Sequence, residues 1–185
     1  MFYYIGSLIS KFINYFENEN LMVDKKSKIW VGNYITGNNV DFMRDNNIKL
    51  VINCTENLHW IDQSNASLQN LIYLRKHVQF ERIPVLDSLQ ERDMRIMYEY
   101  LDKILVKMFN SYLRGENILI YCHMGRQRSQ IVMASFLYKY REAFQEENFR
   151  TKEDVFNYIL TKRPQAFSFG LRVNFLPSFL KYFNE

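Results

Sequence analysis

The stretch between residues 117 and 140 constrains the fold more than any other part of this chain. Residues Asn117–Tyr121 are short and rich in Ile and Leu, which is typical of a strand buried on both faces. Residues 131–140 repeat apolar side chains at helical spacing. The intervening loop has the pattern C-x2-G-x2-R-S, formed by Cys122, Gly125, Arg128 and Ser129. The sequence therefore predicts a strand, a loop and a helix in succession.

A loop that leads into a helix N-terminus favours the binding of an anion. Amide groups at the start of a helix lack intrahelical acceptors, and the helix dipole is positive there, so a phosphate dianion and a thiolate are both stabilised. Gly125 permits the backbone turn that directs these amides inward. The residues expected to bind phosphate are His123, Met124, Gly125, Arg126, Gln127 and Arg128.

Cys122 is the candidate nucleophile of this loop. A free thiol has a pKa near 8.5, which leaves roughly a few per cent as thiolate at neutral pH, so the loop must lower that pKa. Lowering the pKa by one unit takes about 1.4 kcal/mol of preferential stabilisation of the thiolate, which helix amides and the Arg128 guanidinium can supply. Arg128 can also hold two phosphate oxygens, and Ser129 can donate a hydrogen bond to the departing sulfur. The alternative is that Cys122 is a small buried core residue, but Arg128 and Ser129 in register with it argue against that.

Asp87 is the candidate acid that protonates a leaving oxygen. It follows the apolar run at residues 83–86 and precedes a long helical segment, which places it at the carboxyl end of a strand. Its alternative role is that of a turn or helix N-cap residue. Asp93 is the competitor, and its place early in the helical segment favours a first-turn role stabilised by the helix dipole.

The remaining pattern predicts an α/β fold. Strand patterns occur at residues 29–32, 50–54, 79–85 and 117–121. Helical spacing extends from Met94 to Tyr112 and ends near Gly115, and a Thr-x-x-Asp capping box begins another helix at Thr151. Because strands alternate with helices, we expect a central, mostly parallel sheet of about four to five strands flanked by helices.

Composition favours one domain in a reducing compartment. The chain has 185 residues, of which 48% are hydrophobic, enough for one substantial core. Its two cysteines and three histidines lack the spacing of a disulfide framework or a metal site, so we expect no metal and a cytoplasmic location. The basic residues behind the net charge of +4 are dispersed, and no nucleic acid partner is expected. The Asn-, Lys- and Ile-rich composition suggests an AT-rich genome and is consistent with a viral protein, for which the host cytoplasm or the virion is the expected location.

The sequence divides into an N-terminal helical arm at residues 1–27 and a catalytic domain at residues 28–185. The arm is rich in apolar residues, but Lys11 interrupts it, and it has fewer than the ~20 apolar residues that span a bilayer. Three alternatives remain open for it: packing on its own domain, which we place first, exchange with a partner in a homodimer, or peripheral contact with a membrane, which is not favoured.

These features resemble the cysteine-based dual-specificity phosphatases of the protein tyrosine phosphatase superfamily, whose signature is His-Cys-x5-Arg-Ser with an acid Asp upstream. The segments KIWVGNY, NNIKLVINCTEN and TKRPQAFSFGLRVNFLPSFLKYF resemble the family's opening strand, next strand and closing helices, so the resemblance covers residues 28–183. It implies the family's fold and a hydrolase without cofactor that forms a phosphocysteine intermediate. The implied substrates are phosphotyrosine and phosphoserine or phosphothreonine in proteins.

Two positions depart from that signature. Tyr121 stands where the family has histidine, and Gln130 where a small residue is usual. The histidine is thought to brace the loop through a hydrogen bond to the backbone. A tyrosine hydroxyl can replace that brace only in part and carries no imidazolium charge, so we expect a higher Cys122 pKa and slower turnover than in typical relatives.

Two other functions remain open on sequence grounds. Arg126 favours a phosphoinositide or other phospholipid phosphatase, because some lipid-directed relatives carry extra basic residues in this loop. Tyr121 favours a catalytically weak, phospho-binding pseudophosphatase. An RNA triphosphatase is less favoured, because those loops generally place Asn before the arginine, where this chain has Gln127.

Overall fold

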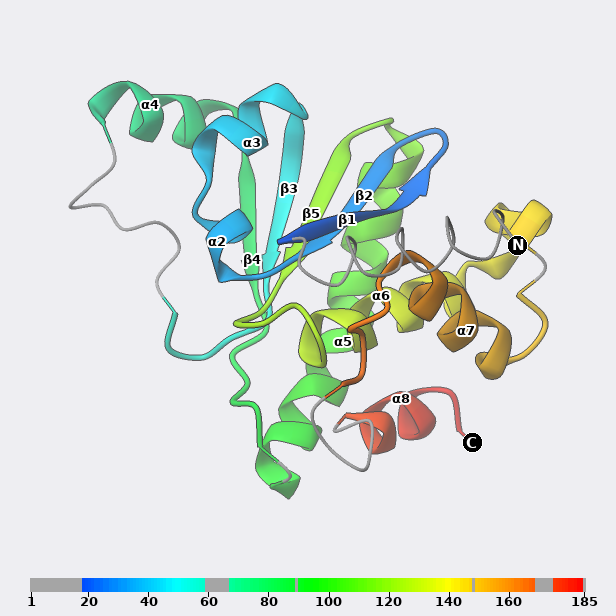
Figure 1. Cartoon of the computed structure of the whole chain (residues 1–185). Helices are drawn as coiled ribbons and strands as arrows, with labels where there is room; N and C mark the ends of the chain where they lie inside the picture. Colours follow the sequence, from blue (N-terminus) through cyan, green and yellow to red (C-terminus); the bar gives the residue numbers. More distant parts are fainter. Residues whose placement is uncertain (1–17, 59–66, 89, 148, 169–174, 185) are drawn as a thin grey trace, which may run out of the picture.

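A five-stranded sheet with helices on both faces forms the centre of the structure (Figure 1). The computed structural model describes residues 18–58, 67–88, 90–147, 149–168 and 175–184. The strand order is β1-β2-β5-β3-β4, in which β2, β5, β3 and β4 are parallel and β1 is antiparallel to β2. The predicted α/β fold with a mostly parallel sheet is confirmed.

The strands are β1 (Glu19–Asp24), β2 (Lys28–Gly32), β3 (Ile48–Asn53), β4 (Gln79–Arg82) and β5 (Asn117–Tyr121). The helices are α2 (Tyr34–Gly37), α3 (Val40–Asp45), α4 (Leu68–His77), α5 (Glu91–Leu113), α6 (Arg128–Lys139), the 3₁₀ helix η1 (Arg141–Glu147), α7 (Lys152–Lys162) and α8 (Leu176–Tyr182).

Side chains along the central strands point alternately to the two faces of the sheet, and so form two cores. On β5, Ile118 and Ile120 belong to the larger core, whereas Leu119 and Tyr121 belong to the smaller one. The larger core includes residues of α5, α6, α7 and α8, and the smaller one includes residues of α2, α3 and α4, the helices labelled in Figure 1. Because both faces are covered, nearly every position of β5 is apolar. Cys122, the next residue along the chain, continues the alternation and belongs to the larger core.

Several predicted boundaries are confirmed, and one predicted strand is shorter than expected. Helix α5 ends before Gly115, which has a φ of +74° as expected of a glycine that follows a helix. The capping box at Thr151 is present, with reciprocal hydrogen bonds between Thr151 and Asp154. The strand predicted at residues 79–85 ends at Arg82, because Pro84 has no N–H to continue the ladder.

The helical arm predicted for residues 1–27 is wrong where the structure describes it. Residues 19–24 form strand β1, in which Met22 and Val23 are buried against the larger core. The Tyr158 hydroxyl of α7 donates a hydrogen bond to the Met22 carbonyl at 2.6 Å and ties this edge strand to the helices. Residues 1–17, and with them the dimer and membrane alternatives, lie outside the described residues. No helix in the described part of the chain is long and apolar enough to cross a bilayer.

The ring of Tyr121 packs directly against Gly37, where no larger residue would leave room for it. A Cβ atom added at Gly37 would lie 2.5 Å from that ring, and Tyr121 is fully buried and cannot move aside. We expect Gly37→Ala to lower the free energy of unfolding by about 1–3 kcal/mol in urea denaturation, although glycine to alanine is ordinarily favourable in a helix. In a Tyr121→Leu background the same change should cost clearly less, and an equal loss in both backgrounds would contradict this packing.

Candidate active site

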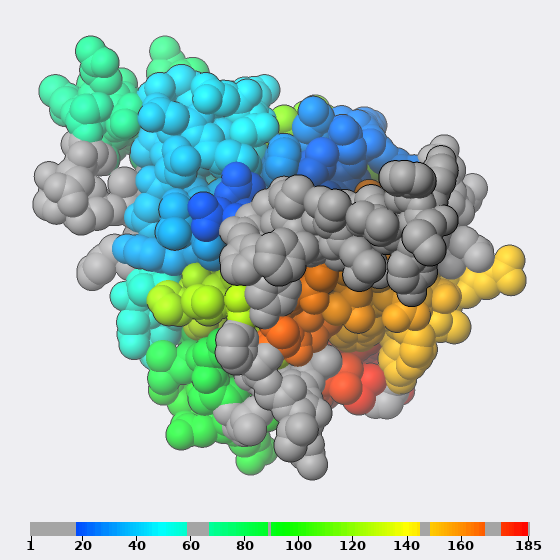
Figure 2. Space-filling model, in the orientation of Figure 1, coloured from blue at the N-terminus to red at the C-terminus, as the bar shows by residue number. Residues whose placement is uncertain are grey.

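The predicted loop lies at the carboxyl edge of the parallel strands. Cys122 is the first residue after β5, and α6 begins at Arg128, so the loop proper covers residues 122–127. The yellow-green segment that follows β5 reaches the molecular surface between blue segments above and green segments below (Figure 2). His123 and Met124 are exposed there, while Cys122 is only 1% exposed.

Four consecutive carbonyl groups of this loop are held by donors outside it. The acceptors and their donors are His123 O with the Tyr34 N–H (3.0 Å), Met124 O with Arg163 Nη2 (3.5 Å), Gly125 O with Gln130 Nε2 (2.8 Å) and Arg163 Nε (2.9 Å), and Arg126 O with the Phe167 N–H (2.6 Å). In a planar trans peptide the C=O and N–H point in opposite directions. The N–H groups of residues 124–127 are therefore directed toward the inside of the loop.

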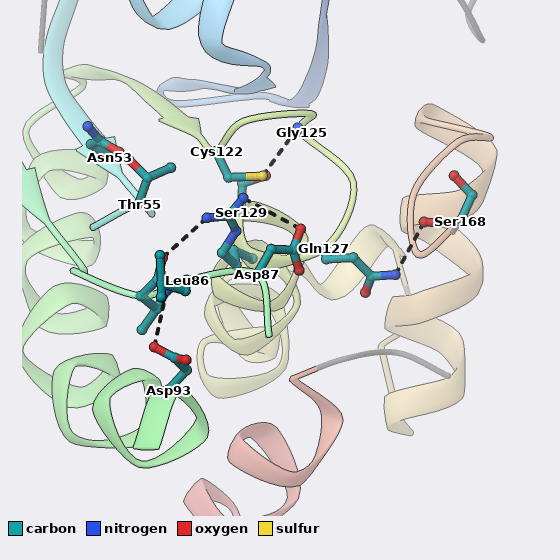
Figure 3. Close-up of polar contacts among 12 residues, drawn as sticks. Asn53, Thr55, Leu86, Asp87, Asp93, Cys122, Gly125, Gln127, Ser129 and Ser168 are labelled. Atoms are coloured by element: carbon teal, nitrogen blue, oxygen red, sulfur yellow. Dashed lines mark hydrogen bonds and ion pairs between the residues drawn. The ribbon is translucent and has the colours of Figure 1, made fainter. Parts of the chain in front are cut away.

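The sulfur of Cys122 receives two of the donors around it. The Gly125 N–H lies 3.2 Å and the Ser129 hydroxyl 3.4 Å from Cys122 Sγ (Figure 3). Burial raises the pKa of Cys122. The Arg128 guanidinium, the Ser129 hydroxyl and backbone N–H groups together lower this pKa by more than burial raises it, so it falls below the ordinary thiol value. The donors and the guanidinium around the sulfur thus stabilise its thiolate form in a site that water scarcely reaches.

Arg128 connects the sulfur to the candidate acid. Its side chain is nearly buried, with Nη1 donating to the Val85 carbonyl at 3.2 Å and Nη2 lying 3.5 Å from Asp87 Oδ2. The Asp87 side chain is 40% exposed, so this carboxyl group remains open to solvent at the edge of the site. The arrangement places a cation beside both the candidate nucleophile and the candidate acid.

A cavity of about 270 Å³ opens at this edge. It is lined by Asp87, Met124, Arg126, Gln127 and Ser168. The Gln127 side chain donates to the Ser168 carbonyl at 3.3 Å and so forms one wall (Figure 3). Four of the residues expected from the sequence therefore line this cavity, namely Asp87, Met124, Arg126 and Gln127. The other expected residues are not among the lining residues: His123 is exposed, and Cys122, Gly125, Arg128 and Ser129 are buried.

The structure contradicts the expected partial brace from Tyr121. Its ring packs over Gly37 in the smaller core, on the opposite face of the sheet from Cys122. The hydroxyl finds no hydrogen-bond partner among the described residues, and burial raises its pKa. The loop is held instead by donors that sequence reasoning did not identify, Arg163 and Gln130.

Asp93 has a second role that its place in the sequence did not reveal. It lies in the first turn of α5 as predicted, but it is fully buried. One carboxylate oxygen accepts from the Leu86 N–H at 3.1 Å (Figure 3). The other accepts from the Ser88 hydroxyl at 2.5 Å. Asp93 therefore clamps the residues on both sides of Asp87. The serine beside Asp87 was the available signal, because a hydroxyl next to a helix start often pairs with a first-turn carboxylate.

The two cysteines should differ in reactivity. In a pH series of iodoacetate alkylation read by mass spectrometry, Cys122 should reach half-maximal reaction at a lower pH than an ordinary free thiol, because the groups around its sulfur lower its pKa. Cys54 should stay unreacted, because burial raises its pKa. Ser129→Ala should raise the midpoint for Cys122 by about one unit, since a hydrogen bond to a charged group is lost. An unchanged midpoint in this variant would show that the hydroxyl does not stabilise the thiolate.

Comparisons with known proteins identify the family of this chain. The family model of the dual specificity phosphatase catalytic domain matches residues 29–184. Similar solved structures include human DUSP28 (17% identity, TM-score 0.66, 90% of this chain and 93% of that chain covered). Others are the Yvh1 phosphatase domain from Chaetomium thermophilum (19%, 0.63, 90% and 95%) and a mouse putative dual specificity phosphatase complexed with zinc tungstate (20%, 0.63, 83% and 80%). No curated protein sequence gives a significant match. The family match, together with the shared fold, shows that this chain belongs to the dual-specificity phosphatases of the protein tyrosine phosphatase superfamily.

Proposed function

We propose that the chain is a cysteine-dependent phosphatase that hydrolyses phosphotyrosine and phosphoserine or phosphothreonine in proteins. The observation that carries this proposal is the environment of Cys122 Sγ, which accepts hydrogen bonds from Gly125 and Ser129 beside the buried Arg128. A buried thiol surrounded by donors and a cation is stabilised as an anion, which is the form that attacks phosphorus.

The first step transfers the phosphoryl group to sulfur. The inward N–H groups and the Arg128 fork bind the phosphate oxygens, whose charge spreads over the equatorial positions during transfer. The Cys122 thiolate forms an S–P bond as the P–O bond to the leaving group breaks. Asp87, in its protonated form, gives its proton to the leaving oxygen. The product is a phosphocysteine and a free hydroxyl group on the substrate.

The second step hydrolyses the phosphocysteine. The Asp87 carboxylate now takes a proton from a water molecule, whose oxygen bonds to phosphorus as the S–P bond breaks. The electron pair of that bond returns to Cys122, and the Ser129 hydroxyl at 3.4 Å stabilises the departing thiolate. Inorganic phosphate leaves, and the same thiolate is ready for another substrate.

The choice of protein substrates rests on family membership, and one feature of the cavity favours a second candidate. Arg126 lines the cavity together with Asp87 and adds positive charge near the bound phosphate. That charge would suit the headgroup of a phosphoinositide. Release of phosphate from phosphoinositide vesicles faster than from phosphopeptides would favour a lipid phosphatase. Binding of phosphopeptides without any turnover would favour a pseudophosphatase.

The most direct test of the chemistry compares the native chain with two variants on p-nitrophenyl phosphate and on a phosphoserine peptide. Cys122→Ser should abolish hydrolysis of both, because a serine hydroxyl is not ionised in this site. Asp87→Asn should slow hydrolysis of the peptide by about 10²–10⁴-fold. Hydrolysis of the aryl ester should slow less, because an aryl oxide leaves without a proton more easily than an alkoxide does. Comparable activity in the serine variant would rule out a thiolate nucleophile.

Asp93 should matter for the same proton transfer through its clamp on the residues around Asp87. Asp93→Ala should slow hydrolysis of the phosphoserine peptide by about tenfold or more, because a small displacement of a general acid lowers the rate of proton transfer strongly. Hydrolysis of the aryl ester should slow less. Glu91→Ala, an exposed first-turn acid of the same helix, is the matched control and should leave both rates unchanged. Equal slowing of both substrates by Asp93→Ala would indicate a general loss of structure instead.

A further inference from the structure

Gln130 is the least expected of the side chains that hold the loop. It lies in the first turn of α6 and is fully buried. Its Nε2 donates to the Gly125 carbonyl at 2.8 Å. The orientation of this side-chain amide is fixed by chemistry, because a carbonyl oxygen can only accept and the nitrogen must therefore face it.

The peptide group that Gln130 holds also carries a donor for the sulfur. The Gly125 carbonyl belongs to the same planar unit as the Arg126 N–H, so a bond that holds the oxygen outward turns the N–H inward. That N–H is one of the groups that lower the Cys122 pKa. Gly125 itself has a φ of +66°. Because glycine adopts positive and negative φ values about equally, steric hindrance does not fix this conformation. The orientation of the peptide group between Gly125 and Arg126 therefore depends on its hydrogen bonds.

The contact costs the protein some stability. Gln130 Oε1 is buried without a hydrogen-bond partner in the described part of the chain, and a buried carbonyl without a partner is unfavourable. An apolar side chain would avoid this. A buried amide that satisfies only one of its two ends is better explained by the group it orients than by the stability it adds.

We propose that Gln130 is a positioning residue: together with Arg163 it holds the Gly125 carbonyl outward and thereby aims the Arg126 N–H at the sulfur and at the phosphate oxygens. It supplies from α6 a brace that Tyr121 does not supply from β5. This role deepens the proposed phosphatase function and rests on it, but the state of the thiol can be measured without any turnover.

Gln130→Met tests the proposal, because methionine has a similar length and no donor. In the iodoacetate pH series, the midpoint for Cys122 should rise by about half to one unit, a three- to tenfold loss of thiolate below the midpoint. The effect is partial because Arg163 Nε still contacts the Gly125 carbonyl. The melting temperature should stay the same or rise. Ser135→Ala is the matched control: Ser135 is equally buried in α6 and makes no hydrogen bond through its hydroxyl within the described residues, so the midpoint should not move.

An unchanged Cys122 midpoint in a folded Gln130→Met or Gln130→Ala protein would overturn the proposal. A measurement on the native chain tests it without any variant. The Arg126 amide proton should shift in NMR spectra with the same pH midpoint as alkylation of Cys122, and an amide that does not titrate would also overturn it. If the native chain showed these results but hydrolysed no phosphate ester, the proposed function would fail while the role of Gln130 in holding the loop would stand.

Discussion

The orientation of four peptide groups in the loop between β5 and α6 is the constraint on which the rest of the site depends. A nearly buried sulfur cannot be ionised without donors close to it, because desolvation opposes the charge. Besides the Ser129 hydroxyl, the donors are backbone amides, which have no fixed direction of their own in a loop. They face inward because each carbonyl on the other side of the peptide is bound by a neighbouring element.

The fold brings those neighbours together from distant parts of the sequence. Tyr34 begins α2, Gln130 lies in the first turn of α6, and Arg163 and Phe167 come after α7. Arg163 is 1% exposed and also receives support from Asn20 of β1, at 2.5 Å from its Nη1 to Asn20 Oδ1. The edge strand β1 thus contributes to the site although it lies two strands away from β5. Loss of any one brace should be partly compensated by the others, which is why we expect graded effects.

The sequence was sufficient for the elements whose pattern is local. The strand, loop and helix around Cys122, the long helix α5 and the capping box of α7 each have spacing or end signals of their own. It was insufficient for β1, whose apolar residues were grouped with the preceding apolar segment in one predicted helical arm, and for the short helices α2 and α3. The roles of Asp93, Arg163 and Gln130 depend on which backbone groups lie beside them in the fold, and no pattern in a single sequence specifies that. The brace expected from Tyr121 was wrong for the same reason, because alternation along β5 turns its ring to the other face of the sheet.

The most direct test of this account is a crystal structure of the chain with orthovanadate, which binds as a five-coordinate analogue of the phosphoryl group in transfer. The account predicts vanadium bonded to Cys122 Sγ, with its equatorial oxygens accepting hydrogen bonds from the N–H groups of residues 124–127 and from Arg128. Vanadate bound at another place, or a loop whose carbonyls face the anion, would contradict it.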